Sequence, residues 1–200
     1  MIYFLDLFGV AVFAITGALV AREKQMDLFG VVVIALVTAL GGGTLRDMIL
    51  GNTPVFWVLN PVYIIVVSIT ALLTVVVTRI YELPRRILSV ADAFGLAIFT
   101  LIATDLVLNQ GLQPIIAVML GVVSSVAGGM IRDLLSDRIP LILRSELYAT
   151  ASLCGAVVFV VISPIAHDVA SVLTVAITLG LRLAAIRWGW TLPAFKMPDT

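Results

Sequence analysis

The chain alternates between long apolar runs and short polar breaks. Each of the long runs approaches the roughly 20 residues that an α-helix needs to cross a bilayer. Proline and an Asn–Pro pair occur in several of the breaks, as is typical of places where helices end. The pattern predicts an all-α membrane protein with seven transmembrane helices, at about 2–20, 28–50, 60–79, 87–104, 113–135, 146–163 and 169–187.

Composition agrees with this pattern. Hydrophobic residues make up 62% of the 200 residues and charged residues only 12%, whereas a soluble domain is about half apolar and about a quarter charged. Continuous apolar runs indicate helices rather than a membrane barrel, in which apolar and polar residues alternate over about 10 residues. The spans use nearly the whole chain, so no separate soluble domain is expected. Net charge is zero without a basic run, which excludes a nucleic-acid partner.

The basic residues of the breaks fall on one side of the predicted bundle. Only the first, third and fifth breaks and the segment after the last span carry them. They are Arg22, Lys24, Arg79, Arg85, Arg86, Arg138, Arg144, Arg187 and Lys196. The positive-inside rule places this side in the cytoplasm. The N-terminus is therefore predicted outside and the C-terminus inside.

Motifs of the first half return 86 residues later. The stretch "DLFGVAVF" at 6–13 returns as "DAFGLAIF" at 92–99, and "GGTLRD" at 42–47 returns as "GGMIRD" at 128–133. Each copy holds three spans, so the second copy enters the membrane in the opposite sense. This predicts two inverted repeats and a seventh helix. The predicted units are residues 1–82, 87–165 and 168–190, with a cytoplasmic tail at 191–200.

Consecutive glycines interrupt the second and fifth spans. Each glycine destabilises a helix interior by about 1 kcal/mol relative to alanine, which favours a kink or break; close helix packing is the alternative. Discontinuous helices at matching positions of inverted repeats mark the transport path. A hydroxyl one turn before each glycine run can line this path or bond to its own helix. The predicted pore and kink residues are Gly41, Gly42, Gly43, Gly128, Gly129, Thr38 and Ser124.

An Arg–Asp pair follows each glycine run, as Arg46–Asp47 and Arg132–Asp133. A charge near the bilayer centre costs about 3 kcal/mol, so such residues face the bundle interior or a watery path. Neighbouring side chains on a helix do not face each other. We therefore predict intramembrane pairs across the repeats, Arg46 with Asp133 and Arg132 with Asp47. The alternative is that each arginine snorkels to the lipid headgroups. If the helices break at the glycines, both aspartates begin the second half-helices, where a carboxylate complements the helix dipole.

Further polar residues lie in or next to the predicted spans. Asp6 and Asp92 match across the repeat and are either intramembrane groups or helix caps. Arg182 is expected to snorkel to the cytoplasmic surface. His167 stands alone in a predicted loop, and the single cysteine excludes an intrachain disulfide. No catalytic set is visible, so the sequence predicts neither an enzyme, nor a cofactor, nor a metal site beyond permeant monovalent cations.

Two three-helix repeats with "GGGTLRD" in span 2 and "AGGMIRD" in span 5 resemble the TRIC family of trimeric intracellular cation channels. The resemblance covers about residues 3 to 190 and is closest to the prokaryotic branch. It implies a homotrimer in a bacterial inner membrane, in contact with membrane lipid. A pore inside each protomer, lined by the kinked second and fifth helices, would pass monovalent cations such as K+ or Na+, chiefly potassium. Ala127 stands where the first repeat has Gly41, which implies a milder second kink.

Two further functions stay open at this stage. Relatives of this kind have been assigned the transport of glycine, so a secondary transporter of a small zwitterion is the alternative to a channel. A non-conducting membrane scaffold is a third. Eukaryotic members of the family bind an inositol lipid through basic residues of the fourth helix. Span 4 has no Lys or Arg after Arg86, so that lipid site is not expected here.

Overall fold

The structure is a computed structural model that describes residues 2–81, 84, 86–143 and 147–191. The predicted tail at 191–200 lies outside the described residues except for its first residue. The described elements are α1 (Ile2–Glu23), α2 (Leu28–Leu50), α3 (Phe56–Leu59), α4 (Val62–Ile80), α5 (Ile87–Asn109), α6 (Pro114–Leu135), the 3-10 turn η1 (Leu141–Leu143), α7 (Ala149–Ile162) and α8 (His167–Trp188).

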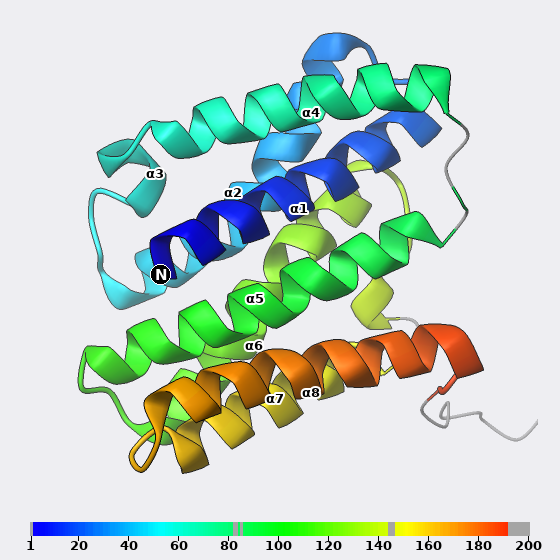
Figure 1. Ribbon diagram of the computed structural model, residues 1–200. Helices are drawn as coiled ribbons and strands as arrows, with labels where there is room; N and C mark the ends of the chain where they lie inside the picture. The colour runs from blue at the N-terminus through cyan, green and yellow to red at the C-terminus, as the bar shows by residue number, and fades with distance from the viewer. Residues whose placement is uncertain (1, 82–83, 85, 144–146, 192–200) are drawn as a thin grey trace, which may run out of the picture.

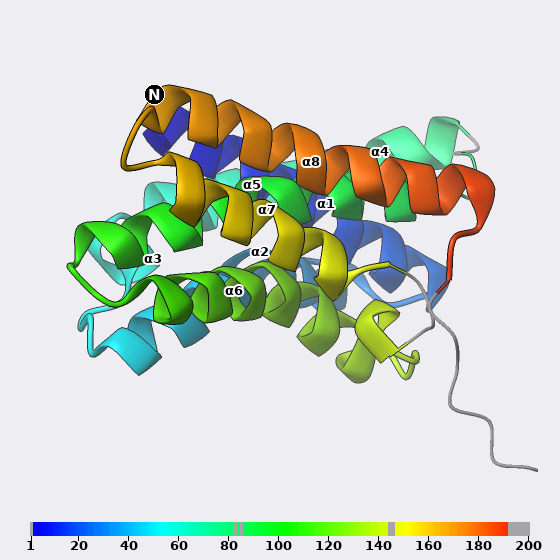
Figure 2. The ribbon, with the colours of Figure 1, turned by 90° about the horizontal axis from the view of Figure 1, so that it is seen from below.

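The helices form two layers. In Figure 1, α4, α1, α5 and α8 lie side by side in one layer, and α2, α6 and α7 lie behind it. Figure 2, seen from below, separates α8 at the top from α7 and then α6. The two central contacts are α1 with α5 in one layer and α2 with α6 in the other. The middle of the bundle is therefore built from the first two helices of each predicted copy.

Six of the described helices are long and apolar enough to cross a membrane. The predicted spans at 2–20, 28–50, 60–79, 87–104, 113–135 and 169–187 correspond to α1, α2, α4, α5, α6 and α8. The predicted span at 146–163 is shorter than expected, because α7 has only 14 residues. At 1.5 Å per residue it is about 21 Å long, less than the roughly 30 Å of hydrocarbon. Seven full spans were predicted, whereas the structure has six and one shorter apolar helix.

Local signals set the ends of α2 and α8. The carboxylate of Asp27 caps α2 by accepting a hydrogen bond from the Gly30 N–H at 2.7 Å. The same helix ends at Gly51 and α8 ends at Gly189, both in the left-handed region with φ of 70° and 68°. Glycine reaches this conformation without steric strain and so terminates a helix.

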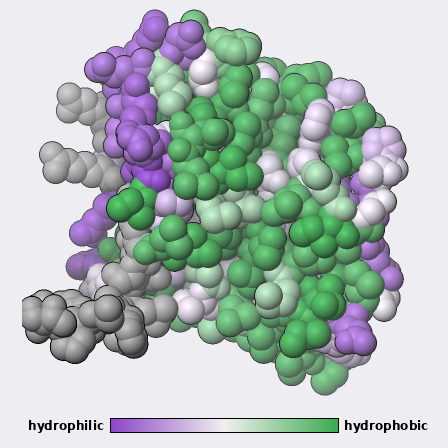
Figure 3. Space-filling model, turned by 180° about the vertical axis from the view of Figure 1, so that it is seen from behind, coloured by the Kyte–Doolittle hydropathy of each residue, from purple (hydrophilic) through white to green (hydrophobic). Residues whose placement is uncertain are grey.

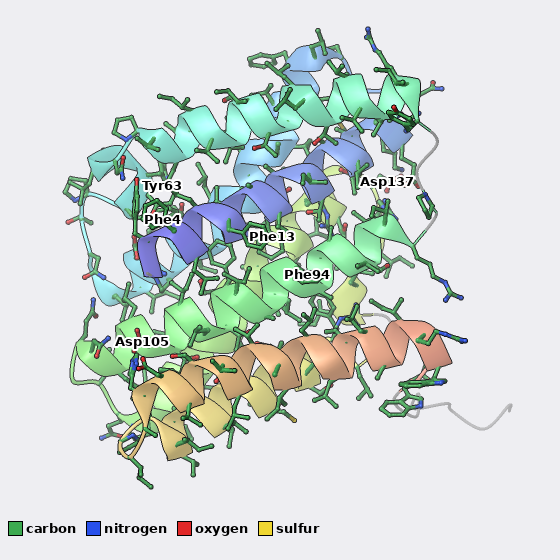
Figure 4. All side chains as sticks on the ribbon, in the orientation of Figure 1. Phe4, Phe13, Tyr63, Phe94, Asp105 and Asp137 are labelled. Carbon is green, nitrogen blue, oxygen red and sulfur yellow. The ribbon has the colours of Figure 1, made fainter. Side chains whose placement is uncertain are left out.

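The loops at one end of the bundle carry the basic residues, and we call it the basic end. Here Arg138 pairs with Glu23 at 3.0 Å and the Lys24 ammonium donates to the carbonyl of Asp137 at 3.2 Å. In Figure 4 the labelled Asp137 lies at this end and Asp105 at the opposite end. Figure 3 shows an apolar surface between hydrophilic residues at the two ends, as expected of a protein embedded in a bilayer.

The glycines of α2 and α6 bring the two helices into backbone contact. A Cβ atom on Gly42 would lie 2.0 Å from the carbonyl oxygen of Ser124, and one on Gly128 would lie 2.1 Å from that of Thr38. These distances are far below van der Waals contact, so only glycine fits. The two contacts are equivalent in the sequence repeat, because Gly128 lies 86 positions after Gly42 and Ser124 lies 86 positions after Thr38. Small residues commonly allow such close approach of membrane helices.

Close packing, the alternative to a kink or break, is therefore what the structure has at Gly42 and Gly128. The prediction that the helices break there is wrong, since α2 and α6 continue as α-helices through all five glycines. The packing gain of the crossing offsets the low helix propensity of glycine. Whether either helix bends stays a prediction.

A second crossing joins α1 to α5. The rings of Phe13 and Phe99 are stacked, with centroids 5.2 Å apart and planes 10° from parallel. A Cβ on Gly95 would lie 2.5 Å from the Phe13 ring, and one on Gly9 would lie 3.2 Å from the Phe99 ring. In Figure 4, Phe13 lies midway along α1, on the side facing α5. Both central crossings thus combine residues that match across the repeat.

Gly42 and Gly41 are expected to respond differently to substitution by alanine. Gly42→Ala should lower the melting temperature in detergent, by an overpacking penalty of about 1–3 kcal/mol or more, because the methyl group meets backbone. Gly41→Ala is the matched control. Its Cβ would meet the terminal carbon of the flexible Ile131 side chain at 3.3 Å and the Gly128 Cα at an ordinary contact distance of 3.8 Å, and alanine favours the helix by up to about 1 kcal/mol. Equal melting temperatures for the two variants would contradict a backbone contact at Gly42.

Candidate functional site

Buried charges lie on both sides of the α2–α6 crossing. The crossing is antiparallel, because Gly42 faces Ser124 while the earlier Thr38 faces the later Gly128. Arg46 therefore lies beyond the crossing toward the end opposite the basic end, and Arg132 lies beyond it toward the basic end. Each arginine is the centre of its own cluster of polar and aromatic groups.

The Arg46 cluster consists of Asp6, Arg46, Asp47, Phe56 and Tyr63. The Arg46 Nε and Nη2 both donate to Asp47 Oδ1, at 2.9 and 2.7 Å. The guanidinium carbon lies 5.8 Å from the centroid of the Phe56 ring, which meets the Tyr63 ring edge-on. The Tyr63 hydroxyl donates a short hydrogen bond to Asp6. The cluster thus holds two carboxylates, of which Asp47 binds the guanidinium group directly and Asp6 binds Tyr63, and Arg46 is only 5% exposed.

The Arg132 cluster consists of Thr16, Asp92, Arg132, Asp133 and Tyr148. Arg132 Nε donates to Asp133 Oδ1, and Nη1 donates to Asp92 Oδ1 and to the Thr16 hydroxyl, each at 2.9 Å. Arg132 and Asp92 are both fully buried. A Cβ on Gly129 would lie 3.3 Å from Asp92 Oδ1 and from the Tyr148 hydroxyl. The glycine thus leaves room where these polar groups converge.

The two Arg–Asp pairs have the same internal geometry. In each, the arginine Nε donates to the following aspartate, whose second oxygen accepts a backbone N–H from the next short helical element. Asp47 Oδ2 accepts from Phe56 N at 3.0 Å in α3, and Asp133 Oδ2 accepts from Leu141 N at 3.2 Å in η1. Each aspartate therefore fixes the loop that follows its helix.

The predicted pairs across the repeats are wrong. Each arginine forms an ion pair with the aspartate that follows it in the sequence, because its long, flexible side chain can reach the adjacent carboxylate. The partners proposed for the cross pairs are also too distant. With Gly42 level with Ser124, Arg46 and Asp133 are about 13 residues apart along the helix axes, or about 20 Å. Equivalent residues of the two copies lie on opposite sides of the crossing.

The predicted role of Asp47 and Asp133 at the start of half-helices is also wrong. Because α2 ends at Leu50 and α6 at Leu135, both aspartates lie near helix C-termini. A carboxylate there opposes the helix dipole. The adjacent arginine and the accepted backbone N–H compensate for this.

Asp6 and Asp92 are tertiary partners and not helix caps. Asp6 lies in the second turn of α1, and Asp92 lies inside α5 with an ion pair to Arg132. The prediction that Arg182 snorkels is wrong, since this side chain is fully buried. Its guanidinium carbon lies 4.7 Å from the centroid of the Tyr148 ring, and its Nη1 donates to the carbonyl of Leu147 at 3.1 Å.

The predicted pore hydroxyls have different surroundings. Thr38 donates to the carbonyl of Ile34 in its own helix at 2.6 Å, as the alternative reading anticipated. Ser124 is buried, and its hydroxyl has no hydrogen-bond partner among the described residues. A further hydroxyl chain joins Thr100 to Ser152 at 2.7 Å and Ser152 to Ser125 at 2.9 Å.

His167 begins α8 and has a partner, in contrast to the isolated loop residue that was predicted. Its Nε2 lies 2.9 Å from Asp105 Oδ1 at the end opposite the basic end. These two residues line a cavity of about 420 Å³ together with Tyr3, Asp168 and Ser171. No group of three or more His, Cys, Asp or Glu side chains within the described part of the chain is placed to hold a metal ion.

The aromatic members of both clusters carry no clear signal in the sequence. Tyr63 and Tyr148 each lie beside the aspartate of the first helix of their copy. Their positions are 85 residues apart, one fewer than the offset of the motifs, so a search at the fixed offset does not align them. Apart from this near match, no sequence signal distinguishes them from interfacial aromatics.

Comparison with known families and proteins places the chain among membrane transport proteins. The glycine transporter family matches residues 3–79 and 89–164. The UPF0126 inner membrane protein YadS of Escherichia coli strain K12 is 45% identical over 203 aligned residues, which cover 100% of this chain and 98% of the relative.

Solved structures share the fold. The TRIC trimeric intracellular cation channel orthologue from Rhodobacter sphaeroides matches with a TM-score of 0.91 and 40% identity, covering 94% of this chain and 98% of that one. A second structure, described in connection with conductance through TRIC cation channels, matches with a TM-score of 0.88 and 37% identity over 98% of both chains. A TRIC channel from C. elegans, 13% identical with a TM-score of 0.62, shares the fold alone.

The buried ion pairs predict a large difference between two arginine variants. Arg132→Gln should destabilise the protein by about 3–5 kcal/mol, because it leaves the carboxylates of Asp92 and Asp133 without their guanidinium partner. Arg138→Gln, in the exposed pair with Glu23, should cost less than about 1 kcal/mol. Denaturation in mixed micelles measures both. The double variant Arg132→Gln/Asp92→Asn should recover part of the loss, and equal effects of the two single variants would refute the burial argument.

Proposed function

Since the chain belongs to the glycine transporter family and has the fold of prokaryotic TRIC channels, we propose that it is a channel for monovalent cations that prefers potassium. The pore lies inside each protomer, between α2 and α6. Three protomers form a homotrimer, as the description of the Rhodobacter sphaeroides relative states for that protein. The protein resides in an inner membrane, as the name of the Escherichia coli relative states for that one.

The two copies found in the sequence form an inverted repeat, with units at 1–82 and 87–165 and a separate helix at 168–190. This is supported by the family match, whose two segments fall one in each copy. The equivalent contacts Gly42–Ser124 and Gly128–Thr38 support it as well. The basic end faces the cytoplasm, since Arg and Lys accumulate in cytoplasmic loops.

One observation carries the proposal: buried charged clusters flank the tightest point between α2 and α6. Ionisable groups deep in a membrane protein generally mark an ion or substrate path. The Arg46 cluster contains two carboxylates and one guanidinium group. Its excess of carboxylate favours cations over anions at that end of the path.

Conduction requires α2 and α6 to separate at Gly42 and Gly128. With backbone contact at both glycines, no ion fits between the helices at this level. Separation breaks no ion pair between the two Arg–Asp motifs, because each is closed on itself. The barrier to opening at this level is therefore mainly lost van der Waals contact.

A second candidate function is a carrier of a small zwitterion such as glycine. The name of the matching family favours it. Within the described residues, Asp92 Oδ2 and Arg132 Nη2 are buried without a hydrogen-bond partner. Such a pair can receive the ammonium and the carboxylate of one ligand.

Planar bilayers distinguish the two functions. We expect the purified protein to give unitary currents that reverse near the potassium equilibrium potential under a potassium chloride gradient. Liposomes of the same preparation should not accumulate labelled glycine by counterflow. Saturable glycine counterflow in the absence of unitary current would overturn the channel and establish the carrier.

Charge removal tests the location of the pore. Asp6→Asn should lower the potassium-to-chloride permeability ratio by at least about twofold, since it removes a carboxylate from the path. The hydrogen bond from Tyr63 is kept by the amide oxygen. Asp168→Asn is the matched control, because that side chain is 98% exposed and lies outside the Arg46 cluster. If the control changes the permeability ratio as much as Asp6→Asn, the pore does not run past Asp6.

A further inference from the structure

A cavity of about 460 Å³ opens at the basic end, away from both charged clusters. It lies between the α1–α2 loop, the start of α2 and the last turns of α4. The loop turns sharply at Gln25, which has a φ of 55°, and so forms one wall. The cavity plays no part in the path between α2 and α6.

Two arginines that form no ion pair with any described residue line this cavity. Arg22 lies in the last turn of α1 and Arg79 in the last turn of α4. In the described part of the chain neither forms a salt bridge, although Arg138 at the same end pairs with Glu23. The one carboxylate in the lining, Asp27, accepts the Gly30 N–H as the cap of α2. The rim of the cavity therefore carries a net positive charge.

The floor of the cavity is apolar. Val31, one turn into α2, and Val75, one turn before Arg79 in α4, line it on the side of the bundle interior, and Val31 is only 3% exposed. A cationic rim above an apolar floor fits an amphiphile with an anionic head. Guanidinium groups bind phosphate oxygens through paired hydrogen bonds, and Arg is well suited to this geometry. Helix-dipole stabilisation explains arginines in a last turn, but it does not explain their position around a cavity.

We propose that this cavity binds an anionic phospholipid, with its phosphate between Arg22 and Arg79 and the upper part of an acyl chain against Val31 and Val75. The position fits this ligand, because the basic end borders the apolar surface of the protein (Figure 3). Anionic lipids accumulate in the cytoplasmic leaflet and attract basic residues next to spans. The site is independent of whether the protein is a channel or a carrier.

Native mass spectrometry of the purified protein with phosphatidylglycerol and phosphatidylcholine tests the proposal. The wild type should retain phosphatidylglycerol preferentially, and Arg22→Gln/Arg79→Gln should bind it at least about tenfold more weakly. Arg86→Gln/Arg187→Gln is the matched control. It removes two exposed arginines that do not line the cavity, and it should bind as the wild type does. Equal losses in both double variants would overturn the proposal.

A second variant separates the lipid from a free phosphate. Val75→Phe fills the apolar floor and leaves both arginines in place, so it should also weaken phosphatidylglycerol binding. Inorganic phosphate at millimolar concentration should not displace the lipid from the wild type. Normal lipid binding by Val75→Phe, or full displacement by inorganic phosphate, would show a phosphate site without an acyl chain and would refute the lipid proposal. Melting temperatures confirm that each variant is folded.

Discussion

The backbone contact between α2 and α6 is the constraint on which the rest of the structure depends. Lipid tails are as apolar as leucine, so membrane helices gain little from hydrophobic burial against one another and rely on close packing. Gly42 and Gly128 provide this packing at one level of the bundle. Because the helices are antiparallel there, this level also fixes Arg46 and Arg132 on opposite sides of it. The separation of the two charged clusters follows from the glycines.

In each charged cluster, the charge of the buried arginine is compensated mainly by carboxylates of the same copy. The adjacent aspartate supplies one carboxylate, and a residue on the first helix of the copy supplies another. The link across copies is the hydrogen bond from Arg132 to Thr16. A guanidinium-to-hydroxyl hydrogen bond costs less to break than a buried ion pair costs to separate. Within the two clusters, relative movement of the copies therefore separates no ion pair.

The sequence allowed the six long spans, the two copies and the equivalence of Gly42 with Gly128 to be predicted. Motif repetition shows which residues are equivalent, but it does not show which residues touch. Because α2 and α6 cross in antiparallel directions, the two Arg–Asp motifs lie on opposite sides of the crossing, so Arg46 cannot reach Asp133. Tyr63 and Tyr148 were not predicted as a matching pair, because they are 85 residues apart and the motifs repeat after 86. The predicted length of α7 was too great because apolar composition does not show where a helix begins.

Helix α8 makes the surroundings of the two charged clusters unequal. It packs against α5 and α7, both of the second copy, and has no equivalent on the first. From it, Arg182 covers the ring of Tyr148 and encloses the Arg132 cluster, where both members of the ion pair are fully buried. Asp6, at the matching position of the first copy, is only partly buried. The Arg132 side of the α2–α6 crossing is therefore more fully enclosed than the Arg46 side, because α8 covers only the second copy.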